Sequence, residues 1–451
     1  LLRGASYLEA IYIQGGNRLE GEVVASGSKN SSLAILAAVL LAEGETFLDN
    51  VPNIGDIHTM LSMLEHLGAK AEWCGDHRLK INTSSITTSE TAYEPVRKMR
   101  ASFNVLGPLL ARFGHAKVAL PGGCDIGARN VDYHVKGLQA LGAQVTVEHG
   151  FADARADRLR GAHIFLDYPS VGATNQIISA AVLAEGTTII ENAAEEPEVV
   201  DLARFLNRMG AKIKGAGTKR VEITGVRRVK PIKYRVIPDR IEAATFAVAS
   251  AMTGGDVIIH RVVYEHIKPV LLKLRETGAE ITVEKPAARL LDSEFPDAEE
   301  IVSVRVRGRG RPRAVDITAA PHPGFPTDVH PPMAALLSIA DGTAVITETV
   351  FERRFRYAAE LARMGADIVV SGQAAVVRGV EKLTGARVVA PDLRAGAALV
   401  LAGLVAEGET EVSGVEHIDR GYENLESKLA QLGANVIRWK EEKSERLVCS
   451  A

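Results

Sequence analysis

The chain has 451 residues, of which 46% are hydrophobic and 24% are charged, and its formal net charge is −3 at pH 7. This length and composition are typical of a globular protein with two or three domains. The balanced charge gives no reason to expect nucleic acid or an acidic membrane surface as a general partner, so a bound anion must be held by locally clustered bases.

The apolar segments and the cysteines indicate the cellular compartment of the protein. The most apolar windows, 33–42 and 397–406, are too short to cross a bilayer. Cys74, Cys124 and Cys449 are scattered without metal-ligand spacing. An odd number of such cysteines is typical of a reducing compartment and argues against a disulfide scaffold. We therefore expect a soluble, cytoplasmic protein without a membrane segment or a metal site.

One structural unit recurs along the chain. Each copy reads as a small-residue helix, a turn that begins with glycine, an alternating strand, a second helix that ends in Gly-Ala, and another strand. The two glycines of each copy keep a nearly constant interval, as Gly44 with Gly68, Gly186 with Gly210, Gly254 with Gly278, Gly342 with Gly365, and Gly408 with Gly433. The second glycine fits a helix C-cap, which needs the left-handed conformation. A sixth, altered copy ends at Gly142, so the pattern predicts six α/β units in two domains of three, with helices packed on sheets.

Five predicted helices consist of small and apolar residues nearly all round. They are 31–42, 176–184, 243–252, 334–340 and 395–406. Helices without a polar face belong in the interior. Two segments rich in helix breakers, 230–239 and 286–296, read as a linker and a surface insertion. We expect the chain to cross between its domains near residue 239.

The first polar candidates lie in the N-terminal half. Ser28, Lys29 and Asn30 precede the first apolar helix. A helix N-terminus beside a lysine attracts anions, although an ordinary N-cap with a solvated lysine would give the same pattern. Arg100 taken alone reads as a helical arginine of the kind that usually forms a surface salt bridge.

The altered copy carries a glycine-rich loop, 121–129, in which Cys124 stands five residues before Arg129. Glycines allow a backbone to approach a ligand or fold over it. A thiol near a cation has a lowered pKa and can act as a nucleophile or an acid, whereas a buried structural cysteine is inert. The surrounding glycines favour a reactive Cys124.

In the C-terminal half, Asp328 ends a proline-rich loop, 321–328, before an apolar helix. It reads either as a helix N-cap or as a general base, which must lie within hydrogen-bond reach of its substrate. Arginines at alternate positions from Arg305 to Arg313 lack interleaved aromatic residues. They indicate a solvated strand face rather than a nucleic-acid stripe.

Together, the repeats and these motifs resemble the enolpyruvyl transferase family, over about Ile13 to Arg438. The resemblance implies an α/β fold, a two-domain inside-out α/β barrel built from six βαβαββ-like repeats, three per domain, with the ligand cleft between the domains. It assigns residues 1–29 plus 240–451 to a C-terminal-type domain and 30–239 to a domain that carries the catalytic loop. Neither a cofactor nor a metal is implied.

The activity that the resemblance implies is transfer of the carboxyvinyl group of phosphoenolpyruvate to the 3-hydroxyl of UDP-N-acetylglucosamine, with release of phosphate, as the first committed step of peptidoglycan precursor synthesis. The partners would be these two small molecules, bound by a monomer, without nucleic acid or membrane. Another acceptor, such as a uridine nucleotide, is the alternative. Shikimate phosphate is disfavoured because that branch lacks the Cys124 loop. A non-catalytic nucleotide-sugar sensor is disfavoured because Lys29, Cys124, Asp328, Arg394 and Arg420 are all present.

The site residues follow from the same resemblance. Cys124 would donate a proton to the vinyl methylene or act in product release, and would be alkylated by the epoxide fosfomycin. Asp328 would deprotonate the sugar hydroxyl. The catalytic set is Cys124, Asp328 and Lys29, and phosphoenolpyruvate would bind Lys29, Arg129, Arg394 and Arg420. UDP-N-acetylglucosamine would contact Asn30, Arg100, Ser170, Val171, Gly172, Asp328 and Val350, and Arg354 and Asp392 complete the active site.

This sequence also departs from the family pattern near the predicted site. Asn130 stands where proline is common, and Asn104 stands where aromatic residues are frequent. Asn175 and Gln176 replace the usual acidic residue and asparagine, and His330 occupies a position where glutamine is commoner. These differences bear on contacts with the acceptor rather than on the type of reaction.

Overall fold

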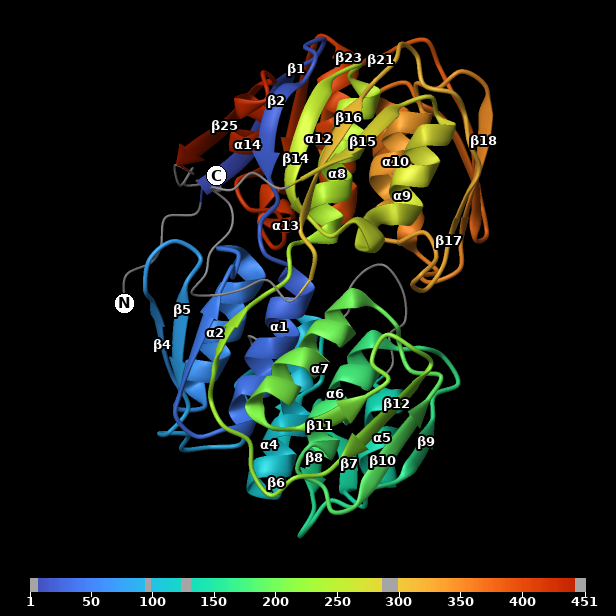
Figure 1. The fold of residues 1–451 in the computed structure, drawn as a ribbon. Coiled ribbons are helices and arrows are strands. Elements are labelled where there is room, and N and C mark those ends of the chain that lie inside the picture. Colours follow the sequence, from blue (N-terminus) through green and yellow to red (C-terminus); the bar gives the residue numbers. More distant parts are fainter. Residues whose placement is uncertain (1–6, 94–98, 123–130, 286–298, 443–451) are drawn as a thin grey trace, which may run out of the picture.

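The computed structural model describes residues 7–93, 99–122, 131–285 and 299–442. The chain forms two lobes, one above the other in Figure 1. Each lobe has its own hydrophobic core. One core gathers residues between Leu33 and Val236, and the other joins residues 11–25 to residues 241–436. We call these the first and the second lobe.

The first lobe carries three of the sheets. Their strands are β3 (Glu45–Asp49), β4 (Lys70–Trp73), β5 (Leu79–Asn82) and β13 (Lys233–Arg235); β6 (His115–Ala119), β7 (Gln144–Glu148) and β8 (Phe151–Arg155); and β9 (His163–Phe165), β10 (Thr187–Glu191), β11 (Lys212–Lys214) and β12 (Arg220–Thr224). In the orders β13-β3-β5-β4 and β11-β12-β10-β9, one edge strand is parallel to its neighbour and the other pairs are antiparallel. The sheet β6-β8-β7 has only a parallel bridge from Glu90 to Lys117 at the corresponding edge.

The second lobe repeats this arrangement with the orders β15-β16-β14-β2, β17-β18-β20-β19 and β22-β24-β1-β25. Its strands are β1 (Tyr7–Gln14), β2 (Glu20–Val24), β14 (Asp256–Val262), β15 (Glu280–Glu284), β16 (Val302–Arg307), β17 (Ile317–Ala319), β18 (Thr343–Glu348), β19 (Asp367–Ser371), β20 (Ala374–Arg378), β22 (Arg387–Val389), β24 (Glu409–Ser413) and β25 (Asn435–Glu442), with a small pair β21 (Leu383–Thr384) and β23 (Ala406–Glu407). The arginines of β16 form the expected solvated strand face, where Arg305 and Arg307 both donate to Asp256.

Six helices line the interiors of the lobes. They are α1 (Lys29–Ala38), α4 (Leu106–Phe113) and α6 (Val171–Ala181) in the first lobe, and α8 (Arg240–Met252), α10 (His330–Leu337) and α12 (Leu393–Val405) in the second. In α12, every residue from Arg394 to Leu404 is buried. Because small side chains let helices approach closely, α10 packs on both α8 and α12. The five helices predicted to be buried correspond to all of these except α4, and their burial is confirmed.

The remaining helices pack between these inner helices and the sheets or lie at the lobe ends. They are α2 (Gly55–His66), α5 (Asp132–Ala140), α7 (Pro197–Met209), α9 (Tyr264–Glu276), α11 (Tyr357–Arg363), α13 (Val415–Ile418) and α14 (Leu425–Gln431), with the 3₁₀ turns η1 (Val39–Leu41), η2 (Arg100–Val105) and η4 (Arg354–Arg356). Helix α7 ends at Gly210, whose φ of 109° confirms the predicted glycine C-cap.

Two segments connect the lobes and run side by side. Gly27 bridges to Pro238, the Ser28 amide donates to the Ile237 carbonyl at 2.8 Å, and the Asp239 amide donates to the Ser26 carbonyl at 2.8 Å. The segment 230–239, which the sequence indicated as a linker, contains strand β13, which the sequence did not predict. The insertion 286–296 lies outside the described residues.

Candidate active site

Asp328 lies between two arginines of the second lobe. Arg354 Nη2 donates to Asp328 Oδ1 at 2.5 Å, and Arg394 Nη2 lies 3.6 Å from Oδ2. Both guanidinium groups are buried. The residue at the start of α10 is Val329, without a side-chain cap. Asp328 is therefore held by cations rather than acting as a helix N-cap.

The charges around Asp328 determine its protonation. Burial alone would raise the pKa of this carboxyl, but the charges of Arg394, Arg354, Lys29 and Arg240 outweigh it and hold the pKa well below its usual range. The group is a stable carboxylate. An anionic ligand that bound the same cations would cancel part of their field and make the carboxylate a better proton acceptor.

Arg394 is positioned by the start of helix α12. Asp392 is the N-cap of α12, and its Oδ1 accepts from the backbone amides of Arg394 at 2.9 Å and Ala395 at 3.0 Å. The Arg394 guanidinium lies 5.2 Å from the centre of the Tyr422 ring. Its Nη1 is buried and has no hydrogen-bond partner among the described residues. A buried donor without a partner is costly, so this atom is suited to an incoming anion.

Lys29 and Arg420 meet on one carboxylate. Lys29 is the first residue of α1, after the N-cap Ser28, and its Nζ lies 3.3 Å from Asp56 Oδ2. Arg420 Nε donates to Asp56 Oδ1 at 2.9 Å. Asp56 is buried in the first turn of α2, so it joins a cation of the second lobe to the first lobe. Sequence reasoning missed Asp56 because an acidic residue in a first helical turn is an ordinary feature.

The predicted nucleotide-sugar residues cluster at the start of α6 and beside η2. Ser170 is the N-cap of α6, and its Oγ accepts from the Ala173 amide at 3.3 Å. Val171 and Gly172 form the first turn of α6. A Cβ on Gly172 would lie 3.0 Å from the His134 ring, and the charge of Arg100 acts on that ring. His134 therefore lies near both Arg100 and the Ser170–Gly172 turn.

His134 is a second residue that sequence reasoning missed. Its Nδ1 lies 2.5 Å from Gln176 Oε1, and burial lowers the pKa of the ring to about 4, so the imidazole is neutral and donates to the amide oxygen. Gln176 is one of the departures from the family pattern. Sequence alone gave no signal for the pair because its members lie on different helices, α5 and α6.

The other predicted residues occupy both sides of the junction. Asn30 follows Lys29 in α1 and is partly exposed. The Val350 amide donates to Glu348 Oε1 at 2.6 Å, and Glu348 in turn contacts Thr327, next to Asp328. Cys124 and Arg129, with the departure at Asn130, lie outside the described residues.

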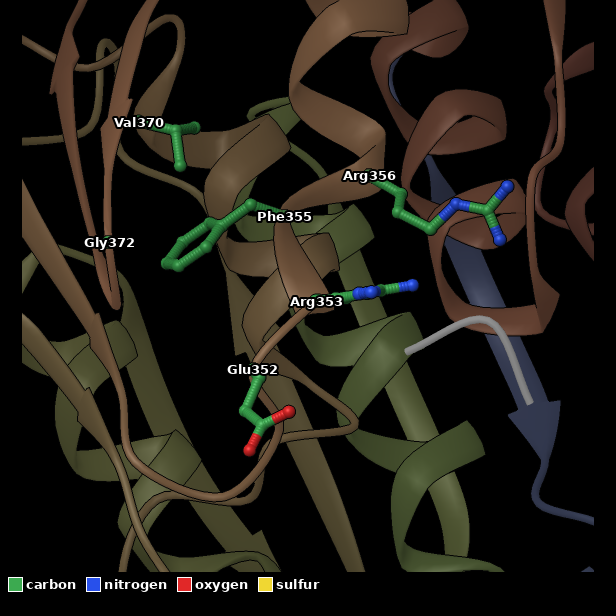
Figure 2. A pocket seen from close by; sticks show the side chains of 6 residues that line it. All are labelled: Glu352, Arg353, Phe355, Arg356, Val370 and Gly372. Carbon is green, nitrogen blue, oxygen red and sulfur yellow. The ribbon is translucent and has the colours of Figure 1, made fainter. Parts of the chain in front are cut away.

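A cavity of about 550 Å³ opens elsewhere on the second lobe, beside η4. It is lined by Glu352, Arg353, Phe355, Arg356, Val370 and Gly372. Figure 2 shows the Phe355 ring directed toward Val370, while the Arg353 and Arg356 side chains extend the other way. None of the predicted site residues lines this cavity.

The described residues contain neither a membrane-spanning helix nor a metal-binding cluster. Between Tyr7 and Glu442, outside the gaps, no helix combines the length and the apolar character that crossing a membrane requires. In the same residues, histidine, cysteine, aspartate and glutamate side chains nowhere gather in a group that could hold a metal ion.

Comparisons with known proteins identify relatives of this chain. The family model of EPSP synthase (3-phosphoshikimate 1-carboxyvinyltransferase) matches residues 13–429. UDP-N-acetylglucosamine 1-carboxyvinyltransferase 2 of Carboxydothermus hydrogenoformans is 53% identical over 96% of this chain and 99% of its own. UDP-N-acetylglucosamine 1-carboxyvinyltransferase of Geobacter metallireducens is 49% identical over 96% and 100%.

Solved structures show the same fold. The enolpyruvyl transferase NikO from Streptomyces tendae superposes with a TM-score of 0.83 and 25% identity, over 97% of this chain and 100% of its own. EPSP synthase from Acinetobacter baumannii superposes with a TM-score of 0.74 and 20% identity, over 96% and 100%. This second likeness concerns the fold alone.

Proposed function

This chain belongs to the EPSP synthase family of carboxyvinyltransferases, and we infer that it transfers the carboxyvinyl group of phosphoenolpyruvate to the 3-hydroxyl of UDP-N-acetylglucosamine. The observation that carries the inference is the pair of relatives, 53% and 49% identical over nearly their whole length, that bear this activity in their names. The reaction releases phosphate and is the first committed step of peptidoglycan precursor synthesis.

We propose a finer architecture than the shared α/β fold, namely the inside-out barrel of six βαβαββ-like units with the ligand cleft between two domains. Its support is the repeated sheet pattern and the six inner helices. We place the domain boundaries at residues 1–29 plus 240–451 and 30–239. The separate cores and the paired crossing segments support these boundaries.

For the chemistry, we propose that Asp328 takes the proton of the acceptor 3-hydroxyl while that oxygen attacks C2 of phosphoenolpyruvate. The adjacent methylene gains a proton, for which Cys124 is the proposed donor. Loss of a proton from that carbon then expels phosphate and restores the double bond. Asp328 is suited to the first step because it is ionised and its side chain is only partly buried, with 26% of it exposed, so a hydroxyl can reach the carboxylate.

We propose that Lys29, Arg394 and Arg420, together with Arg129, hold the phosphate and carboxylate of phosphoenolpyruvate. Guanidinium groups match both anions in a two-pronged geometry. The unpartnered Arg394 Nη1 supports this role, and Arg354 would keep Asp328 oriented. Asp392 would act indirectly by positioning Arg394, since its carboxylate caps the N-terminus of α12 and accepts from the Arg394 amide.

For the acceptor, we propose contacts with Asn30, Arg100, Ser170, Val171, Gly172 and Val350. The supporting feature is the N-terminus of α6, where backbone amides and the helix dipole suit a diphosphate. We also propose a cytoplasmic monomer, because a single chain supplies the cations of both lobes.

The test is phosphate release from phosphoenolpyruvate with each acceptor in turn. UDP-N-acetylglucosamine should support release, and UMP or 3-phosphoshikimate should not. Equal release with UMP would replace the acceptor assignment by the uridine-nucleotide alternative. Binding of UDP-N-acetylglucosamine without any release would indicate a sensor. Light scattering of the purified protein tests the monomer.

A further inference from the structure

A buried hydrogen-bonded network lies next to Asp328 and consists of Thr327, His330, Glu348 and Tyr357. His330 and Glu348 have fully buried side chains. His330 Nδ1 lies 3.0 Å from Glu348 Oε2, and His330 Nε2 lies 2.6 Å from the Tyr357 hydroxyl. The imidazole also makes edge contacts with the Phe355 and Tyr357 rings. The network therefore links α10, the end of β18 and the start of α11.

The chemistry of the groups fixes the proton positions in this network. Burial lowers the pKa of His330, so the ring is neutral. Burial alone would raise the pKa of Glu348, but hydrogen bonds from His330 and Thr327 lower it, so this carboxyl is ionised. A carboxylate only accepts, so Nδ1 of His330 carries the hydrogen. Nε2 must then accept from Tyr357, whose hydroxyl stays protonated because burial raises its pKa.

Glu348 uses both of its oxygens to hold two loops together. Oε2 accepts from Thr327 Oγ1 at 2.7 Å in addition to His330. Oε1 accepts from the backbone amides of Val350 at 2.6 Å and Phe351 at 3.1 Å. One carboxylate thus fixes the residue before Asp328 to the turn that follows β18.

The same backbone is fixed from the other side by Arg354. Its Nε donates to the Thr327 carbonyl at 3.2 Å while its Nη2 donates to Asp328. On one side of Asp328 in the chain, Thr327 is held by Glu348 and Arg354. On the other side, His330 is held by Glu348 and Tyr357. The backbone on both sides of Asp328 is therefore held in place by these contacts.

We propose that His330 and Glu348 are positioning residues for Asp328, which hold its carboxylate at the reacting hydroxyl of the acceptor. The proposal rests on the proposed function, in which Asp328 is the general base. It assigns a role to His330, where this chain departs from the commoner glutamine. None of the four network residues is among the proposed substrate contacts. Its effect is on the rate of the chemical step.

A purely structural role would also make these residues costly to replace, so stability alone cannot test the proposal. A positioning role has a different signature. Loss of the network should lower kcat and leave the KM values unchanged, since substrate contacts are made by other groups. The loss should also vanish when Asp328 itself is removed, because residues that act through one group are not additive.

The test compares His330→Phe, His330→Gln and a control, each in the full chain. Phenylalanine preserves the ring packing and removes both nitrogens. Glutamine can still donate to Glu348 and accept from Tyr357. The matched control is His260→Phe in β14, since His260 is also buried between a hydroxyl, Ser303 at 2.7 Å, and a carboxylate, Glu22 at 3.1 Å. Neither partner of His260 belongs to the Asp328 loop.

We expect His330→Phe to lower kcat about tenfold, a typical result of slight misplacement of a reacting group, with both KM values within about twofold of the parent. His330→Gln should recover most of the rate, and His260→Phe should keep it. In an Asp328→Asn chain, adding His330→Phe should cost less than about a further twofold.

Three outcomes would overturn the proposal while leaving the base assignment intact. They are an unchanged kcat in His330→Phe, a full tenfold loss in the Asp328→Asn chain, or an equal loss in His260→Phe. Normal turnover by Asp328→Asn alone would instead refute the assignment of Asp328 as the general base, and absence of phosphate release by the parent chain would refute the proposed function. Thermal melting of each variant separates these results from unfolding. If His330→Phe does not fold, Tyr357→Phe, which removes only the hydroxyl, is measured in its place. We then expect a smaller loss of kcat, again with unchanged KM values and without a further loss in the Asp328→Asn chain.

Discussion

At the scale of single residues, Asp328 shows how surroundings determine chemistry. Four cations hold its pKa well below the ordinary range despite burial, so the free enzyme keeps a carboxylate of low basicity. Phosphoenolpyruvate would bind two of these cations, Lys29 and Arg394, and reduce their field at Asp328. The base would therefore become effective only after the donor has bound, which limits unproductive deprotonation.

Replacing this carboxylate tests its role directly. Asp328→Asn keeps the size of the side chain and an oxygen for Arg354, but removes the proton acceptor. We expect turnover to fall by about 10²-fold or more, the usual range for a lost general base, with little change in substrate binding. Steady-state kinetics and nucleotide-sugar titration are the measurements. Normal turnover would show that Asp328 has only a structural role.

Cys124 is the residue for which chemistry can be tested without a structure. Arg129 and neighbouring bases should lower the pKa of its thiol, which then donates a proton more readily and is present in part as the thiolate that opens an epoxide. Fosfomycin should therefore add covalently, and peptide mass mapping should find the adduct on Cys124. Cys124→Ser should remain unmodified, and exposed Cys74 is the internal control. An adduct on another peptide would refute the assignment.

At the scale of elements, those parts of the fold could be predicted that local sequence patterns determine. Runs of alanine, leucine and valine predicted the buried helices because such segments have no polar face. Strand β13 was missed because three residues between prolines read as a linker. Asp56, His134 and Glu348 were missed because each acts through partners distant in sequence, which no local spacing reveals.

The start of α6 offers a test of the proposed nucleotide-sugar site. Gly172→Ala would place a Cβ 3.0 Å from His134, tighter than an ordinary contact. The first turn of α6 or the ring must shift by a few tenths of an ångström. We expect the KM for UDP-N-acetylglucosamine to rise several-fold, while the KM for phosphoenolpyruvate, measured on the same protein, stays constant. A rise in both would place the effect outside the acceptor site.

At the scale of the whole molecule, the proposed ligands come from both lobes. Asp328, Arg394 and Arg420 belong to the second lobe, Arg100 and Ser170 belong to the first, and Lys29 follows one of the two crossing segments. Neither lobe can assemble the site alone. The two crossing segments are joined to each other by backbone hydrogen bonds, and a small number of chain crossings is where a hinge between lobes can act.

This arrangement predicts that the acceptor compacts the protein. UDP-N-acetylglucosamine offers a sugar to the Asp328 side and a diphosphate to the α6 side, so binding energy from the remote uridine diphosphate can draw the lobes together. Solution scattering should show a smaller radius of gyration with UDP-N-acetylglucosamine, and a weaker change with phosphoenolpyruvate alone. UMP, which lacks both the sugar and the second phosphate, is the matched control. Equal compaction by UMP would mean that closure does not depend on the sugar and would favour the alternative acceptor.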